Sequence, residues 1–246
     1  GGHMPAGQGG RHYERMLVTK INYFALKNGL DLQCSDPAGA NKNEKDIKIT
    51  GVKALTIEAK NTIGKRGEFG QFQIKWADGE WRLKNPKNTE LAEKIFNSAV
   101  DKLPAVTSHD TLSYTNLNFS IADDLRKEWL GSRFEDGKYA GFDVVDIDTK
   151  DLGLSPAGII EEYYAGNDGI QIDGYGLYGL SDKIPTRFSD AEPLVKIKFR
   201  VKYHGGFKKG NPRYSFTMTP FVEDLAASEL DLECEETLTQ IFMEQV

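Results

Sequence analysis

The stretch KDIKITGVKALTIEAKNT, Lys45 to Thr62, contains two short apolar runs separated by a turn. The pattern predicts an antiparallel hairpin across Thr50-Gly51. Alternate side chains of a strand point to opposite faces, so Glu58 and Lys60 share a face, roughly 6–7 Å apart along the strand. A tight hairpin also brings Asp46, which opens the first strand, level with Glu58. The stretch therefore predicts two carboxylates and one ammonium at one end of a sheet.

This predicted cluster matches the ligand preference of a hard cation. Mg²⁺ takes oxygen ligands and keeps several waters, so two carboxylates suffice to hold it. The ion stabilises a phosphorane-like transition state and acidifies water, while the lysine positions that water or the phosphate. An exposed ion pair, worth ~0–1 kcal/mol, explains the same residues without any chemistry. Asp36 competes with Asp46 as the aspartate, but SDPAG has the composition of a turn, which favours Asp46.

The flanking segments predict an α/β arrangement around this hairpin. Apolar residues at helical spacing predict a helix over residues 11–28, ended by Asn28-Gly29. Residues 30–34 read as a strand, and QFQIKW and EWRLK form a second hairpin around Ala77-Asp78-Gly79. Thr89 to Lys102 is predicted as a helix capped by Asn88 or Thr89.

Taken together, Asp46-Ile47-Lys48-Ile49 followed by Glu58-Ala59-Lys60 resembles the motif of the PD-(D/E)XK nuclease superfamily. Lys45 stands where that family loosely keeps a proline. The resemblance covers about residues 11–100 and implies a restriction-endonuclease-like core, a mixed β-sheet flanked by helices, with a β-rich C-terminal extension. It implies Asp46 and Glu58 as metal ligands and catalytic residues, with Lys60 orienting the attacking water.

The resemblance also implies a cofactor and a substrate. The cofactor is Mg²⁺, for which Mn²⁺ substitutes, and the substrate is double-stranded DNA cut by an endonuclease to leave a 5′-phosphate. Cutting both strands requires two sites, so a homodimer is expected, organised as in a compact type II restriction enzyme. A structure-selective nuclease acting on junctions, flaps or RNA, a non-catalytic DNA-binding module, and a β-rich interaction protein stay open as alternatives.

Three further positions are candidates on the same resemblance. Glu14, on the first predicted helix, stands where the family often has a metal-facing glutamate, although a surface glutamate is an equal reading. Gln71 shares a strand face with Gln73 and Lys75 and is a candidate catalytic contact to phosphate or water, or else part of a polar solvent face. The glycine-flanked loop with Lys65 and Arg66 is a candidate DNA contact or an ordinary surface loop.

The second half of the chain is less regular. Helices are predicted at residues 120–130 and from Ser155-Pro156 to about Ala165. GIQIDGYGLYGL is either a recognition element or a core strand kinked by glycines. The predicted organisation is a vector-derived tail over residues 1–10, a nuclease core over 11–105, and a DNA-recognition and dimerisation region over 106–246 that completes the same domain, with an acidic tail from 221.

A long hairpin from Leu194 to Pro220 contains a strictly alternating strand, VKIKFRVKY. Its cations lie on one face, where like charges repel one another unless a partner of opposite charge neutralises them. The phosphate backbone of a nucleic acid would be such a partner. Lysines that protect an exposed sheet edge from aggregation are the alternative explanation. The predicted DNA contacts are Lys196, Lys198, Arg200, Lys202, Lys208, Lys209 and Arg213.

Composition sets the remaining bounds. The chain has 246 residues and a net charge of −6, which becomes +2 without the segment from Phe221 to Val246, where eight acids and no Lys or Arg occur. That segment is either a solvated acidic helix or a shield for a basic groove. Few cysteines and the lack of a long apolar run predict a cytoplasmic, intracellular protein of prokaryotic or viral source with no membrane partner. Neither a P-loop nor a dinucleotide fingerprint is present, so no nucleotide cofactor is expected.

Overall fold

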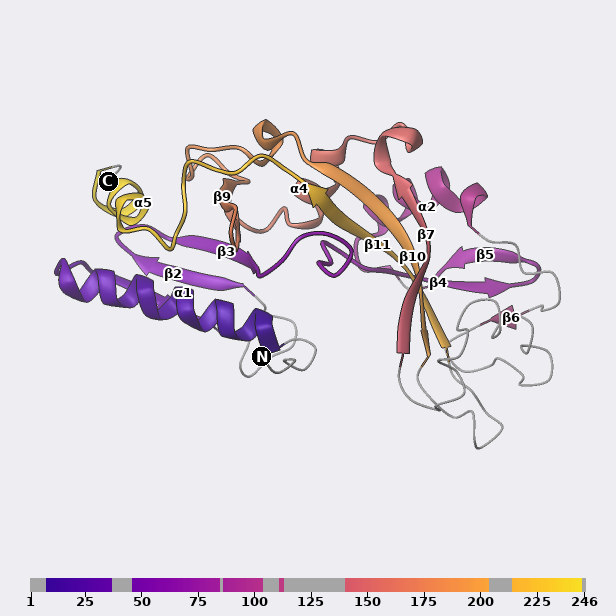
Figure 1. Ribbon diagram of the computed structural model, residues 1–246, viewed down its shortest axis with the longest axis horizontal. Coiled ribbons are helices and arrows are strands. Elements are labelled where there is room, and N and C mark those ends of the chain that lie inside the picture. The colour runs from indigo at the N-terminus through magenta and orange to yellow at the C-terminus, as the bar shows by residue number, and fades with distance from the viewer. Residues whose placement is uncertain are drawn as a thin grey trace. The chain divides into compact units, whose positions relative to one another are not determined.

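The computed structural model describes residues 8–36, 46–84, 86–103, 111–112, 140–203 and 214–244. The chain divides into two compact units, each built on one β-sheet. The first unit comprises Gly1–Gly67, Tyr164–Leu194 and Glu223–Val246, and the second comprises Glu68–Tyr163 and Val195–Val222. The predicted mixed α/β class is therefore confirmed, with two sheets flanked by helices (Figure 1).

The sheet of the first unit has the strand order β1-β2-β3-β8-β9. Its strands are β1 (Leu32–Ser35), β2 (Ile47–Gly51), β3 (Leu55–Lys60), β8 (Gly169–Ile172) and β9 (Gly176–Gly179). Neighbours are antiparallel except β3 and β8, which are parallel, so the sheet is mixed. A parallel neighbour requires a crossover, and here the chain passes through Glu68–Tyr163 of the second unit before it returns as β8.

Helix α1 (Gln8–Lys27) lies along β1, β2 and β3, as Figure 1 shows. The predicted apolar positions Leu17, Ile21 and Phe24 are buried, and they join Leu55 and Ile57 of β3 in one core. The helix ends as predicted, because Gly29 adopts a φ of 60°, and the amide of Leu30 donates to the carbonyl of Ala25. The apolar periodicity thus correctly predicted this helix, and its apolar residues are the ones that it buries.

The acidic segment at the C-terminus belongs to the same core. Its apolar residues are buried, namely Leu225, Leu230, Leu232, Leu238, Ile241 and Phe242. They come from an extended stretch, the short helix α5 (Glu235–Thr239) and the π-helical turn η7 (Gln240–Glu244). The segment is therefore an integral part of the first unit rather than a solvated acidic helix.

The sheet of the second unit has the order β5-β4-β11-β10-β7, with β6 paired to β4. Its strands are β4 (Phe72–Ala77), β5 (Glu80–Leu83), β6 (Thr111–Leu112), β7 (Ala140–Asp148), β10 (Leu194–Tyr203) and β11 (Tyr214–Asp224). The predicted β4–β5 hairpin is confirmed, and its turn uses positive φ at Asp78 and Gly79, 55° and 78°. Trp81 packs edge-on against Phe199 and Phe216 in the core of this sheet.

The remaining helices are short. They are α2 (Thr89–Ala99), α4 (Pro156–Tyr163) and the 3₁₀ turns η2 (Val100–Lys102), η4 (Thr149–Leu152) and η5 (Phe188–Ala191). Ser155 begins α4 as predicted, since its Oγ accepts from the amide of Gly158 at 3.1 Å. GIQIDGYGLYGL forms the fully buried hairpin β8–β9, which makes it a core element. The helix predicted at residues 120–130 lies outside the described residues.

Candidate active site

The hairpin β2–β3 brings the predicted cluster together. Its register pairs Ile47 with Ile57, so Asp46, one residue before β2, comes opposite Glu58. The Asp46 carboxyl lies close enough to Glu58 to contribute to raising the pKa of Glu58. Lys60 Nζ lies 3.5 Å from Glu58 Oε1. The geometric prediction that two acids and one amine meet at the end of this hairpin is confirmed, and Asp46 rather than Asp36 is the aspartate beside Glu58.

Burial controls the electrostatics of this cluster. Glu58 is only 7% exposed. Desolvation raises the pKa of Glu58 to about 8; the ammonium of Lys60 opposes the shift, and the hydrogen bond and charge of Asp46 add to it. Near neutral pH this raised pKa keeps most of Glu58 in its protonated form. Lys60 Nζ also lies over the ring of Tyr164, 5.3 Å from its centroid, which fixes the ammonium on this face.

Two touching carboxylates, one of them withdrawn from water, match the donor set of a divalent cation. A divalent cation held by Asp46 and Glu58 would remove the repulsion between the two acids. Within the described parts of the chain, no group of three or more His, Cys, Asp or Glu side chains is arranged to hold a metal. Glu14, half-buried on α1, is thus not assembled with Asp46 and Glu58 as a third ligand.

The neighbouring strand β8 places apolar side chains beside the cluster of Asp46, Glu58 and Lys60. In the parallel pairing of β3 with β8, Glu58 is in register with Ile170, and Lys60 with Ile172. Both isoleucines are fully buried. They keep water away from the β8 side of the cluster, which strengthens the charge interactions within it.

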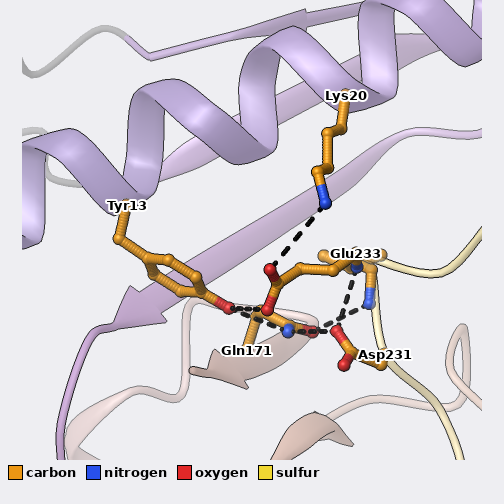
Figure 2. A network of polar contacts seen from close by, with 6 residues as sticks. Tyr13, Lys20, Gln171, Asp231 and Glu233 are labelled. Carbon is orange, nitrogen blue, oxygen red and sulfur yellow. Dashed lines mark hydrogen bonds and ion pairs between the residues drawn. The ribbon is translucent and has the colours of Figure 1, made fainter. Parts of the chain in front are cut away.

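The opposite face of β3 and β8 has a second polar cluster, which the sequence analysis missed. Gln171 is fully buried and in register with Ala59, and its amide donates to Tyr13 Oη at 3.0 Å and to Asp231 Oδ1 at 2.7 Å. Tyr13 in turn donates to Glu233 Oε2 at 3.2 Å. Figure 2 shows how these side chains converge from α1, β8 and the C-terminal segment.

This network ties the acidic segment to the sheet. The amide of Leu232 donates to Gln171 Oε1 at 3.0 Å, and Lys20 Nζ lies 3.9 Å from Glu233 Oε1. Burial raises the pKa of Tyr13, and burial together with the charge of Asp231 raises the pKa of Glu233. A lone glutamine between two isoleucines of an apolar strand was the signal that could have revealed it, because a buried amide must find partners.

The other candidates near the motif occupy exposed positions. Lys65 and Arg66 are exposed in a turn closed by the Gly67 amide, which donates to the Gly64 carbonyl at 2.9 Å. Gln71 is exposed just before β4 and lines a cavity of the second unit. Because Gln71 and the acidic pair belong to different units, a contact of Gln71 with the reacting phosphate stays a prediction.

The prediction of a continuous exposed cationic face on β10 is wrong. Lys198 is fully buried, and its Nζ lies 5.6 Å from the centroid of the Phe221 ring. Arg200 pairs with Glu68 at 3.0 Å. The physical reason is the neighbouring strand β7, which places Asp148 in register with Lys196 and Asp146 in register with Lys198.

The repulsion between the cations of β10, which suggested a phosphate partner, is therefore reduced by acidic residues of the protein itself. Lys202 is in register with Gly141, which adds no charge of its own. The tip residues Lys208, Lys209 and Arg213 lie outside the described residues. DNA contact by the exposed part of this hairpin stays a prediction.

Comparison with protein-family models, curated proteins and solved structures finds no match for this chain. Among the helices of the described residues, none has the length and apolar character needed to cross a membrane.

Proposed function

We propose that this chain is a divalent-metal-dependent endonuclease that hydrolyses phosphodiester bonds of double-stranded DNA, with Asp46, Glu58 and Lys60 as its active site. The observation that carries the proposal is the meeting of these three side chains across β2 and β3, with Glu58 buried beside a second acid. A structural ion pair has no need of a second acid beside the first, since two adjacent carboxylates oppose folding unless a proton or a cation joins them, and the proposal includes a proton shared by Asp46 and Glu58 when no cation is bound.

The fold supports a restriction-endonuclease-like core of the PD-(D/E)XK type. Helix α1, the antiparallel strands β1, β2 and β3, and a fourth strand, β8, parallel to β3, form a mixed sheet with the charged motif at its centre. Sequence-specific cutting by a homodimer, as in type II restriction enzymes, is part of the proposal, because two sites are needed to cut two strands.

In the proposed reaction, Asp46 and Glu58 would hold Mg²⁺ or Mn²⁺, which would supply charge neutralisation at the phosphate and a more acidic water. Lys60 donates hydrogen bonds from Nζ and so orients the attacking water or the scissile phosphate. Glu58 would bind the cation as a carboxylate, having released its proton to solvent, and its buried surroundings hold the carboxylate in place. Lys65 and Arg66, exposed just beyond β3, contact neighbouring phosphates of the backbone.

The test compares DNA cleavage with Mg²⁺ by the parent, Glu58→Ala and Lys60→Ala, with the exposed Lys48→Ala and Glu229→Ala as controls from the same unit. We expect both site variants to bind duplex DNA as the parent does and to cut it at least about a hundredfold more slowly. Calorimetric titration of Mn²⁺ gives a second readout, with weakened binding in Glu58→Ala. Cutting by Glu58→Ala at the parent rate would end the proposal.

The choice of substrate separates the remaining alternatives. Discrete fragments from plasmid DNA indicate sequence recognition, whereas cleavage restricted to branched DNA or RNA indicates a structure-selective nuclease. Duplex binding without metal binding and without cleavage of any of these substrates indicates a DNA-binding module.

A further inference from the structure

The second unit contains a cavity of about 520 Å³ at the start of β4, the segment after β5 and the end of α4. This volume is in the ~300–1,000 Å³ range of small-molecule sites. Its polar lining consists of Gln71, Gln73, Lys84, Lys87 and Asn88, and its aromatic lining of Phe72 and Tyr163. Among the described residues that line it, none is acidic.

The lining is suited to an anion attached to a ring. Lys84 and Lys87 bring two ammonium groups, which hydrogen-bond a phosphate as point charges. The amides of Gln71, Gln73 and Asn88 each offer donors and an acceptor, the combination that the edges of a nucleobase require. Glu162, next to Tyr163 in the chain, is paired with Lys94 at 3.2 Å, so that acid is engaged by another cation.

The aromatic wall of the cavity is held rigidly. The ring of Tyr163 contacts Phe72 in an edge-to-face geometry with centroids 5.8 Å apart. On another side it rests on the backbone of Gly70, where a Cβ would come within 3.2 Å of Tyr163 Cδ2. Gly70 also has a φ of 140°, so glycine is required there on both counts. A preorganised ring beside amides and ammonium groups is an arrangement that nucleotide sites use for stacking.

We infer that this cavity binds one nucleotide, with its phosphate at Lys84 and Lys87 and its base against Tyr163 and the amides. The nucleotide is either a free nucleoside monophosphate or one unit of a DNA strand. The inference does not rest on the proposed nuclease activity, because it uses none of the residues of the acidic pair. It concerns binding to the second unit alone.

The test uses the full chain carrying Glu58→Ala, in EDTA, so that binding is measured without cleavage. Calorimetry follows the titration of each of the four deoxynucleoside 5′-monophosphates and of a short single-stranded and a duplex oligonucleotide. The variant is Lys87→Glu, at an exposed lining position, and its matched control is Lys102→Glu, exposed in the same unit and outside the cavity. Gln73→Ala removes one amide at an exposed position, which leaves the fold intact.

We expect Lys87→Glu to weaken nucleotide binding about ten- to hundredfold, Gln73→Ala a few-fold, and Lys102→Glu not at all. Binding of monophosphates indicates a free nucleotide, and Lys87-dependent binding of oligonucleotides alone indicates a unit of a strand; either result supports the inference. Equal losses in Lys87→Glu and Lys102→Glu, or no binding of any of these probes at millimolar concentration, overturn it. Binding of an oligoglutamate peptide in place of nucleotides also overturns it.

Discussion

Strands β3 and β10 both alternate apolar and charged residues, yet their charged faces have opposite environments. On β3, Glu58 lies beside a second acid, Asp46, and Lys60 Nζ lies 3.5 Å from Glu58 Oε1. On β10, Lys196 and Lys198 lie opposite the acids Asp148 and Asp146 of β7. The first strand concentrates like charge, whereas the second is neutralised by its neighbour.

The difference shows that the neighbouring strand decides whether a charged strand face is neutralised within the sheet or stays available to bind a ligand. Opposite charges in register stabilise a sheet by ~0.2–1 kcal/mol per pair, and like charges in register destabilise it. The β7–β10 pairing is therefore what a stable sheet needs. The Asp46–Glu58 pairing opposes stability, and such sites cluster where a protein binds ions or performs catalysis.

The largest stability effect is expected at Lys198. Replacement by Met keeps the length of the side chain but leaves the Asp146 carboxylate, whose Oδ1 is buried, without the cation opposite it. We expect Lys198→Met to lower the free energy of unfolding by about 3 kcal/mol, measured by urea denaturation. Lys196→Met, at a half-buried position on the same face, should cost about 1 kcal/mol or less.

DNA affinity provides the counter-test for Lys198. A buried ammonium makes no contact with a phosphate backbone, so the salt dependence of DNA binding should be the same for Lys198→Met and the parent. A flatter salt dependence in a variant of unchanged stability would show that this strand face is open to DNA, and the contrast between β3 and β10 would then be lost.

The next effect concerns the pH dependence of stability at Glu58. Its pKa is about 8 in the folded chain against an ordinary value of 4.5, so the folded state keeps a proton that the unfolded state loses. The stabilisation is fully present below pH 4.5 and is lost as the pH rises through about 8. In EDTA, the free energy of unfolding should therefore fall between these values, by at most about 1.4 kcal/mol per pH unit.

Glu58→Gln isolates this contribution, because the amide does not titrate. The difference in unfolding free energy between parent and variant should change across the interval from pH 5 to pH 8. If the two proteins kept a constant difference over that interval, Glu58 would be ionised in the folded chain and the proposed proton sharing would be incorrect.

The reverse face of β8 should respond as a purely structural site. Gln171→Leu leaves the amide of Leu232 without its acceptor and removes the bond that Tyr13 Oη accepts, although Tyr13 still donates to Glu233; we expect a cost of about 2 kcal/mol in unfolding free energy. Gln33→Leu, at an exposed position of β1 in the same sheet, should change the value by less than about 0.5 kcal/mol. Similar costs for the two substitutions would mean that the network in Figure 2 contributes nothing to the attachment of the C-terminal segment.

The smallest effect is expected for the pair Arg200–Glu68. Both side chains are partly exposed, at 24% and 33%, and their atoms are 3.0 Å apart. A double-mutant cycle with Arg200→Gln and Glu68→Gln should give a coupling free energy of about 0.5–1 kcal/mol that decreases in high salt. Zero coupling together with a loss of DNA affinity in Arg200→Gln would return this arginine to the list of DNA contacts.

Local pattern was sufficient for most elements near the motif. The apolar spacing of Leu17, Ile21 and Phe24 fixed α1, and the alternation around Ala77-Asp78-Gly79 fixed the β4–β5 hairpin. The Asp46–Glu58–Lys60 cluster was also predictable, because a hairpin sets its own register over a few residues. The Gln171 network was not, since the side chains that it joins are separated by 60 to 220 residues along the chain.

The sequence by itself determined that two acids and an amine meet at the end of one hairpin, because all three residues belong to the same pair of consecutive strands. Only the tertiary structure decided that β7 neutralises β10, that the acidic C-terminal segment joins the first core, and that β4 and β3 belong to different sheets. The physical reason is that pairing between strands distant in the sequence depends on burial and on charge matching between those strands. The local alternation of apolar and polar residues does not contain this information.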